Sequence, residues 1–244
     1  MKWIAFIPAR AGSLRVKSKN IRPLMGHPLL AYSIASAQES GLFDRIIVST
    51  DSEEFREIAI QYGAEVPFLR PPELASSVSL DIHWLTHAYQ QLKGYEFDAF
   101  ALLRPTSPLR TAATIRRAAA RLIALPEADS IRAVELVHQH PGKMWTVTGD
   151  KLQPFLPQDE MDVPWHARQY QDLPKVYVQN SSLEMARAHV VTRDRSREGK
   201  AIAPFFTESH EGLSIDYELD WVLIEHLVST GAAVLPVPRK LGLT

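Results

Sequence analysis

The chain has 244 residues, 45% of them hydrophobic and 23% charged, so it is long enough to bury one sizeable core. Its formal net charge of -1 gives no overall attraction to nucleic acid or to an anionic membrane, so any anion site must come from a local cluster of cations. The chain contains no cysteine, which excludes disulfides, thiolate zinc sites and cysteine nucleophiles.

The first predicted element is a short apolar strand at residues 3–8, which reads WIAFIP. The N-terminus lacks the long apolar stretch and the small-residue cleavage site of a signal peptide. No run of the sequence approaches the roughly 18 apolar residues that a membrane span requires. We therefore expect a soluble, cytoplasmic protein that binds neither membrane nor nucleic acid.

A cation-rich loop follows this strand and reads ARAGSLRVKSKN over residues 9–20. Gly12 lets main-chain N–H groups approach an anion closely, and the arginines and lysines around it can neutralise a triphosphate. The spacing matches neither the Walker loop nor the G-x-G-x-x-G fingerprint. The loop predicts a polyphosphate site, and the alternative is a solvated basic loop.

Strand-like and helix-like segments then alternate along the chain. This alternation predicts an α/β fold with a doubly wound, mostly parallel sheet whose ligands bind at the carboxyl ends of the strands. The cation-rich loop, Asp51 and Arg104 all follow such ends. We expect Asp51 to cap the helix that begins at Ser52. The further predicted strands are 45–50, 98–103 and 130–137, and the predicted helices are 28–40, 52–62, 79–92 and 111–124.

Residues 138–175 interrupt the alternation with many prolines and two tryptophans and show little periodicity. An irregular segment of this length inside a domain usually has a function, and the alternative is a surface hairpin without a partner. After it we expect a strand at 176–187, a helix at 222–230 begun or capped by Asp220, and a last strand with a tail at 234–244.

Five segments of the chain resemble the acylneuraminate cytidylyltransferases, the enzymes that make CMP-sialic acid and related CMP-sugar acids from CTP. The resemblance implies a Rossmann-like nucleotidyltransferase made of one domain, residues 1–244, in which residues 138–175 form an excursion that packs against a second subunit in a homodimer. It implies condensation of CTP with a 2-keto-3-deoxy sugar acid and release of pyrophosphate. The segments are IAFIPARAGSLRVKSKN at 4–20, VSTDSEE at 48–54, RPPELA at 70–75, RPTSPLR at 104–110 and SIDYELDW at 214–221.

The resemblance also implies roles for individual residues. Asn20 has two equal alternatives, recognition of the nucleobase or locking of the loop through backbone hydrogen bonds. Mg²⁺ is the implied cofactor, and Asp216 is its one matching ligand. The implied catalytic residues are Arg10, Arg15, Lys19 and Asp216; the nucleotide-binding residues are Ala9, Arg10, Ala11, Gly12, Ser13, Asn20 and Arg70; the substrate-binding residues are Arg104, Ser107, Lys143, Gln179 and Asn180.

Five positions depart from the family pattern, and two of them are Val178, where some sialic acid enzymes have an arginine, and Ser181, where the usual residue is glycine. Leu14 replaces a lysine that stabilises charge at the phosphates, so Arg15 or Lys17 is expected to take over. Ser214 replaces the first of two aspartates, and Arg104 replaces the more usual glutamine. These departures leave two alternatives to a nonulosonic acid synthetase: a cytidylyltransferase for Kdo or a phosphonate, or a catalytically impaired nucleotide-binding partner.

Overall fold

The computed structural model describes residues 1–13, 15–159 and 162–242. The chain divides into two compact units. The core unit comprises Met1–Ala133 and Asn180–Thr244, and the excursion unit comprises Val134–Gln179. Among the described residues, none of the helices combines the length and the apolar character needed to cross a membrane.

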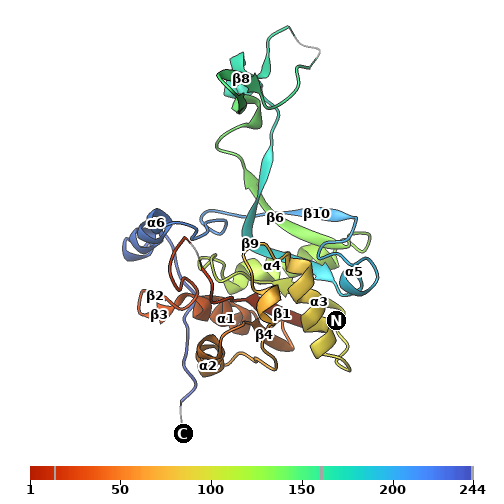
Figure 1. Ribbon diagram of the computed structural model, residues 1–244, viewed down its shortest axis with the longest axis vertical. Coiled ribbons are helices and arrows are strands. Elements are labelled where there is room, and N and C mark those ends of the chain that lie inside the picture. Colours follow the sequence, from red (N-terminus) through yellow and green to blue (C-terminus); the bar gives the residue numbers. More distant parts are fainter. Residues whose placement is uncertain (14, 160–161, 243–244) are drawn as a thin grey trace. The chain divides into compact units, whose positions relative to one another are not determined.

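A six-stranded sheet with the order β10-β6-β9-β5-β1-β4 organises the core unit (Figure 1). β1 (Trp3–Pro8) pairs in parallel with β4 (Arg45–Ser49) and β5 (Ala99–Leu102), and β9 (Tyr177–Arg187) runs antiparallel to β5. The sheet confirms the predicted α/β fold. The remaining strands are β6 (Ser130–Leu136) and β10 (Ile202–Phe206).

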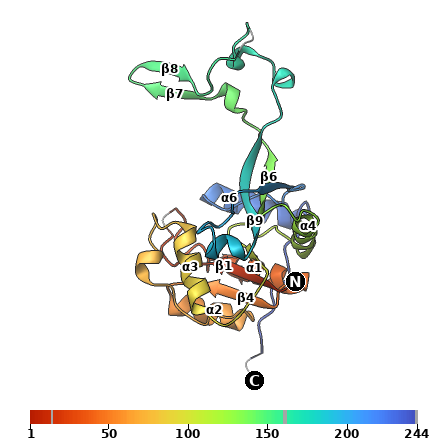
Figure 2. The ribbon, with the colours of Figure 1, turned by 90° about the vertical axis from the view of Figure 1, so that its right-hand side faces the viewer.

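Helices cover both faces of this sheet, because side chains of β1 alternate between two apolar clusters. Ala5 and Ile7 pack in one cluster with α1 (Leu29–Ser40), α2 (Glu53–Gln61) and α4 (Ala112–Ile123). Ile4 and Phe6 pack in the other with α3 (Asp81–Gln91) and α5 (His189–Thr192). Figure 2 shows α3 and α4 on opposite sides of the strands of the core unit. Burial on both faces explains why the strands read as continuous apolar runs.

A third apolar cluster joins the C-terminal segment to the residues that follow the cation-rich loop. It contains Ile215, which precedes α6 (Glu218–Ser229), and Trp221, which lies in α6, together with Val16, Leu29 and Tyr32. The short hairpin of β2 (Pro23–Leu24) and β3 (His27–Pro28) lies between the loop and α1. This packing brings the segment around Asp216 next to the residues that follow the cation-rich loop.

The predicted last strand is wrong within the part of the tail that the structure describes, residues 234–242. Pro236 and Pro238 have no N–H to donate to a neighbouring strand, and Val234 and Val237 are largely exposed. The sixth strand of the sheet is β10, which the sequence did not predict.

The excursion unit contains one antiparallel hairpin of β7 (Trp145–Thr148) and β8 (Lys151–Pro154). Gly149 adopts a φ of 59° in its turn, a conformation that favours glycine. Its described residues also include irregular turns, in which His140 accepts the Gly142 N–H at Nδ1 and lies with Nε2 3.0 Å from the Pro174 carbonyl oxygen. Short 3₁₀ turns occur at Pro141–Lys143, Trp165–Ala167 and Tyr170–Asp172, and in the core unit at Pro72–Leu74.

Candidate functional site

The loop after β1 is held in shape by two side chains. Asp51, at the end of β4, accepts the Ala11 N–H at 2.9 Å. The buried amide of Asn20 donates to the Arg10 carbonyl at 3.0 Å. Of the two alternatives for Asn20, the structure therefore contains the loop-locking hydrogen bond. Leu14 lies outside the described residues.

The prediction that Asp51 caps α2 is wrong. Ser52 is the N-cap, and its hydroxyl accepts the Phe55 N–H. Asp51 instead reaches across to the loop, because β1 and β4 are parallel neighbours whose carboxyl ends lie side by side. The position of Asp51 at a strand end was the signal that could have revealed this role.

Arg70 is buried beside the end of β4. Its guanidinium donates from Nη2 to the Ser49 carbonyl at 2.9 Å and from Nε to the Ser49 hydroxyl at 3.2 Å, and it stacks on Trp84. Burial lowers the pKa of Arg70 to about 10, although the nearby carboxylates of Asp51 and Asp81 oppose this shift. Arg70 therefore braces the strand end that carries Asp51.

Asp216 meets two predicted catalytic cations. Its Oδ1 lies 3.3 Å from Lys19 Nζ and 3.8 Å from Arg15 Nη1. The Asp216 N–H donates to Asp220 at 2.8 Å, as does the Tyr217 N–H. Helix α6 begins at Glu218, earlier than predicted, with Tyr217 as the N-cap, and Asp220 lies in its first turn and accepts the N-cap N–H. The structure thus joins residues almost two hundred positions apart in the chain.

The other loop residues are placed differently. The Arg10 side chain donates to the Ala75 carbonyl at 3.3 Å. The Ser13 N–H donates to the Ala11 carbonyl at 2.8 Å, which tightens the loop around Gly12, and the buried Ala9 donates to the Ser49 carbonyl. Among the described residues, apart from its two chain neighbours, no heavy atom lies within 4 Å of the position that a Cβ would take at Gly12, which leaves room there for a ligand.

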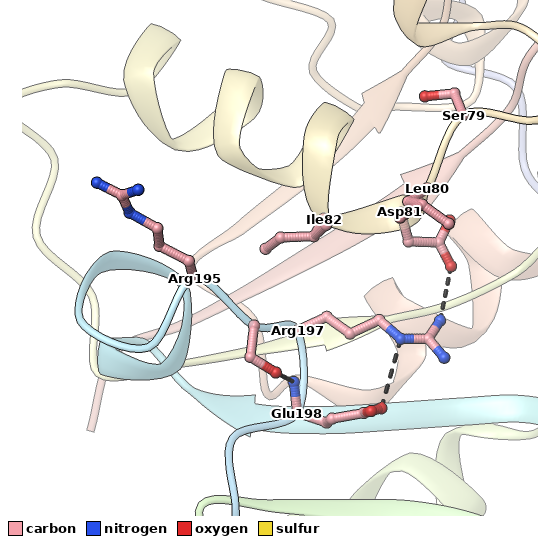
Figure 3. A pocket seen from close by; sticks show the side chains of 8 residues that line it. Ser79, Leu80, Asp81, Ile82, Arg195, Arg197 and Glu198 are labelled. Carbon is pink, nitrogen blue, oxygen red and sulfur yellow. Dashed lines mark hydrogen bonds and ion pairs between the residues drawn. The ribbon is translucent and has the colours of Figure 1, made fainter.

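Arg104 sits in an ion network at the carboxyl end of β5. It pairs with Asp81 and lies 3.4 Å from Glu184, and Arg197 shares both acids at 2.7 and 3.5 Å. These partners compensate the partly buried arginine, so its placement does not by itself require an anionic ligand. A pocket of about 440 Å³ borders the network (Figure 3). Its lining residues are Ser79, Leu80, Asp81, Ile82, Arg195, Ser196, Arg197 and Glu198.

The remaining predicted substrate residues are divided between the two units. Ser107 is fully buried and Asn180 donates to the Thr207 hydroxyl at 2.9 Å, both in the core unit. Lys143 and Gln179 belong to the excursion unit. There Lys143 Nζ donates to the carbonyls of His166, at 2.9 Å, and Arg168, which ties two turns of that unit together.

The oxygen donors around Asp216 fit a magnesium ion. The carboxylate is about half exposed, and the Ser214 hydroxyl lies 3.4 Å from its Oδ2. Magnesium prefers oxygen ligands and is commonly held by one or two carboxylates together with substrate phosphates and water. A single accessible carboxylate beside a cation-rich loop is sufficient for such a site.

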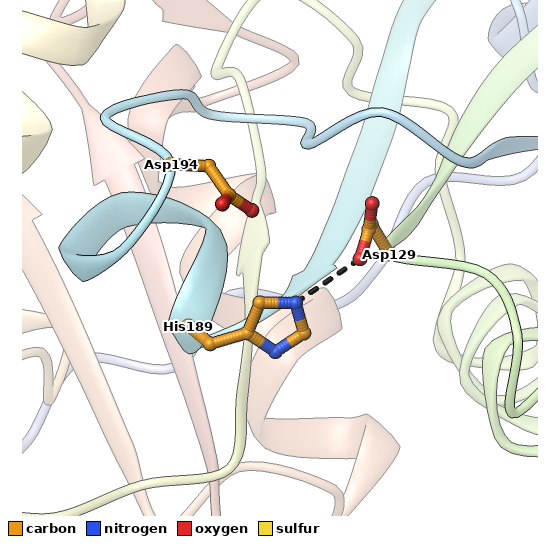
Figure 4. A group of neighbouring side chains, drawn as sticks. All are labelled: Asp129, His189 and Asp194. Carbon is orange, nitrogen blue, oxygen red and sulfur yellow. Dashed lines mark hydrogen bonds and ion pairs between the residues drawn. The ribbon is translucent and has the colours of Figure 1, made fainter.

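A second group of potential metal ligands, Asp129, His189 and Asp194, lies elsewhere (Figure 4). Asp129 accepts the N–H groups of Lys200 and Ala201, and these hydrogen bonds lower the pKa of its carboxyl to about 2. The Arg187 N–H donates to the Asp129 carbonyl, and Arg187 pairs with Ala99 at the beginning of β5. The group therefore lies near the amino end of β5, whereas the cation-rich loop follows the carboxyl end of the parallel strand β1.

The Asp81 carboxylate gives a prediction for stability against pH. Burial alone would raise its pKa, but Arg104, Trp84 and Arg197 lower it to about 2, below the unfolded value near 3.8. A depressed folded pKa stabilises the protein above the unfolded pKa, and this contribution is lost as the pH falls from about 4 to about 2. We expect Asp81→Asn to lose about 2 kcal/mol of unfolding free energy at neutral pH.

The check is chemical denaturation of wild type, Asp81→Asn and Glu73→Gln, an exposed acid, at a series of pH values. The Asp81→Asn deficit should shrink as the pH falls below 4, and the Glu73→Gln curve should follow wild type. A deficit that is independent of pH would contradict the assignment.

Comparison with known proteins agrees with these features. The sequence profile of the family described as Cytidylyltransferase matches residues 4–195. The CMP-N,N'-diacetyllegionaminic acid synthase of Legionella pneumophila is 35% identical over 241 residues, which cover 96% of this chain and 100% of that protein. The N-acylneuraminate cytidylyltransferase of Escherichia coli is 47% identical over 109 residues, which cover 45% of this chain and 25% of that protein.

Similarity to solved structures supports the fold. The structure of CMP:2-keto-3-deoxy-manno-octonic acid synthetase complexed with CTP superimposes with a TM-score of 0.70 and covers 95% of this chain and 100% of that one. The sequence identity is 13%, so the likeness concerns the architecture alone.

Proposed function

We propose that this chain, which belongs to the cytidylyltransferase family, transfers CMP from CTP to a nonulosonic acid and releases pyrophosphate. The observation that carries the proposal is the meeting of Asp216 with Lys19 and Arg15 beside the loop after β1. In metal-assisted phosphoryl transfer a carboxylate holds the metal ion and nearby cations neutralise the charge on the phosphates, and this arrangement supports that chemistry. The anomeric hydroxyl of the sugar acid attacks the α-phosphorus, and no covalent enzyme intermediate is required.

Catalysis in this proposal rests on positioning and charge. Attack at the α-phosphorus develops negative charge on the nonbridging oxygens and on the departing pyrophosphate. The N–H groups around Gly12 and the guanidinium of Arg15, whose side chain is 61% exposed, are available to stabilise that charge. Bound Mg²⁺, held by Asp216, supplies a Lewis acid for the phosphate oxygens.

The nature of the acceptor follows from the relatives. The Legionella protein, matched over its whole length, is named for diacetyllegionaminic acid, and the Escherichia coli protein is named for N-acylneuraminate. Both names describe N-acylated nonulosonic acids. We infer an acceptor of this class and a cytoplasmic location, where CTP is available, and Kdo remains an alternative that the experiment distinguishes.

The excursion unit supports a homodimer. Its hairpin and the residues after it expose several large apolar side chains, and exposed apolar patches mark interaction surfaces. We propose that the partner is a second copy of the chain. Sedimentation velocity at micromolar concentration measures the oligomeric state directly. The side chains concerned are Met144, Trp145, Val147, Leu152, Phe155, Val163, Tyr170 and Tyr177.

The test of the proposed function is pyrophosphate release with CTP, Mg²⁺ and a panel of acids: N-acetylneuraminate, legionaminate, pseudaminate and Kdo. A calorimetric titration with CTP and with UTP accompanies it. Release with an N-acylated acid supports the proposal, and release with Kdo alone transfers the activity to the alternative acceptor. CTP binding without release from any acid would favour the catalytically impaired partner.

Asp51 gives a prediction for nucleotide affinity. Asp51→Ala removes the acceptor that holds the Ala11 N–H, so the loop is no longer pre-shaped. We expect the Kd for CTP to rise about tenfold. Asp51→Asn keeps an acceptor oxygen, so its Kd for CTP should rise less than that of Asp51→Ala. Equal CTP affinity of Asp51→Ala and wild type in calorimetry would contradict the role of Asp51.

A further inference from the structure

The loop that follows α5, residues 193–201, is held in a fixed shape at its base. The Asp129 carboxylate accepts the Ala201 N–H at 3.0 Å, and the Ser196 hydroxyl accepts the Gly199 N–H at 3.0 Å. Gly199 adopts a φ of 72°, and a Cβ there would lie 2.5 Å from the Asp129 Cβ. The loop therefore requires glycine at this position and holds its charged side chains at defined places.

One of these side chains, Arg197, enters the ion network around Arg104. Its Nη1 lies 2.7 Å from Asp81 Oδ2, and its Nε lies 3.4 Å from Glu198 (Figure 3). Nη1 also lies 3.5 Å from Glu184. Arg104 pairs with the same oxygen of Asp81, so a single carboxylate joins the two arginines.

The charges of this network cancel one another. Arg132 pairs with Glu198 and lies 3.1 Å from Glu184, so each acid has at least two arginine partners. A ligand group with a charge of its own would have to break one of these ion pairs, which is costly for partly buried charges. A neutral polar group can form hydrogen bonds with the network and leave it intact. The members are Arg104, Arg132 and Arg197 with Asp81, Glu184 and Glu198.

Arg197 keeps hydrogen-bond donors for such a ligand. A guanidinium has five N–H donors, two on each terminal nitrogen and one on Nε. Nη1 and Nε face the acids, whereas Nη2 has no hydrogen bond or ion pair with any other residue in the part of the chain that the structure describes. The side chain is 26% exposed, so the guanidinium is partly open to a ligand.

The pocket beside Arg197 lies at the carboxyl end of β5. Glu184 is opposite Leu102, the last residue of that strand, and Arg104 follows it. The neighbouring parallel strand β1 leads into the loop that takes the triphosphate in the proposed function. Ligands of a doubly wound sheet bind at such ends, so the end of β5 is left for the second substrate. The pocket volume of about 440 Å³ is within the usual range for small-molecule sites.

We propose that Arg197 is a specificity-determining residue for the acceptor, and that its Nη2 donates to the carbonyl oxygen of an N-acyl group that enters this pocket. An amide is neutral and polar, as the balanced network requires, and Ile82 in the pocket lining can contact the methyl of the acyl group. Arg195 also lines the pocket but points away from the network (Figure 3). The inference rests on the proposed function, because it assigns a contact to the acceptor of that reaction.

The experiment compares Arg197→Met, Arg197→Lys and Arg193→Met with wild type. Arg197→Met should fold, because Asp81, Glu184 and Glu198 each keep another arginine partner. Arg193→Met is the matched control, since Arg193 lies in the same loop, pairs with Asp194 and does not line the pocket.

Two ligands that differ at one substituent are compared by their Kd in the presence of CTP and EDTA, which prevents turnover. One is N-acetylneuraminate or legionaminate, whichever wild type binds more tightly. The other is the analogue of N-acetylneuraminate that carries a hydroxyl in place of the acetamido group. The kcat and KM for pyrophosphate release with the N-acylated acid are measured with Mg²⁺.

For Arg197→Met we expect the Kd and the KM for the N-acylated acid to rise about tenfold, with kcat within about threefold and the Kd for the hydroxyl analogue within about twofold of wild type. Arg197→Lys should recover part of the affinity, and Arg193→Met should behave as wild type. An equal loss of affinity for both ligands in Arg197→Met, or no loss for either, would overturn the role of Arg197.

These readouts separate the two claims. If wild type binds the N-acylated acid but releases no pyrophosphate, the proposed function fails, and the comparison of Kd values still decides the role of Arg197. If wild type is active and Arg197→Met binds both ligands as wild type does, the proposed function stands and the role of Arg197 fails. Wild type that binds neither ligand would overturn both.

Discussion

Asp216→Asn is expected to reduce Mg²⁺-dependent pyrophosphate release by about a thousandfold. Asparagine keeps the size of the side chain and one oxygen but removes the negative charge that a divalent cation requires. The charge partner of Lys19 and Arg15 disappears at the same time. The measurement is the steady-state rate of pyrophosphate release at saturating CTP and acceptor.

Glu218→Gln is the matched control for this substitution. Glu218 lies two residues after Asp216 and also pairs with a cation, Arg22, but it is exposed. We expect its turnover to stay within about threefold of wild type, since an exposed ion pair contributes little. Near-normal activity of Asp216→Asn, with the unfolding transition intact, would remove Asp216 from the metal site.

Arg110→Ala is expected to lower the free energy of unfolding by about 3 kcal/mol or more. The Arg110 guanidinium is completely buried and donates to the carbonyls of Ser182 and Arg104 and, at 2.6 Å, to the Ser33 hydroxyl. It therefore ties together β9, the turn after β5 and α1. Burial lowers the pKa of Arg110 to about 9, because it disfavours the charged guanidinium.

Truncation to alanine leaves a cavity and removes the donor from each of these acceptors, which is why the loss is large despite the unfavourable burial of the charge. Urea denaturation measures it. Arg116→Ala in α4, the helix that follows Arg110, is the control, because Arg116 donates to the Glu39 carbonyl at the surface and its loss should cost less than about 1 kcal/mol. A loss for Arg110→Ala as small as that of the control would contradict this account.

Three strands of the central sheet were predictable because strands that are buried on both faces consist of short, continuous apolar runs. The runs at 3–8, 45–50 and 98–103 correspond to β1, β4 and β5 within one or two residues. Because these strands are parallel, their carboxyl ends lie at the same end of the sheet. The residues that follow those ends, namely the cation-rich loop, Asp51 and Arg104, therefore come together there. The general location of the site therefore followed from the sequence.

The pairing of side chains within the site was not predictable in the same way. Lys19 and Asp216 meet because α6 packs on the residues after the loop, and no periodicity in either segment specifies that contact. Asp51 satisfied two local rules, a helix start and a strand end, and only the register of β1 with β4 decided between them. The sequence suggested that Arg104 binds an anionic substrate, because its protein partners, Asp81 and Glu184, lie far from it in the sequence and could not be identified there.

The most direct test of the central claim is phosphorus NMR of a reaction containing the protein, CTP, Mg²⁺ and an N-acylated nonulosonic acid. The account predicts the loss of the CTP signals together with equal amounts of pyrophosphate and a CMP phosphodiester. Turnover of CTP to CMP or CDP without a sugar-linked phosphodiester, or no change in CTP with any N-acylated acid, would contradict it.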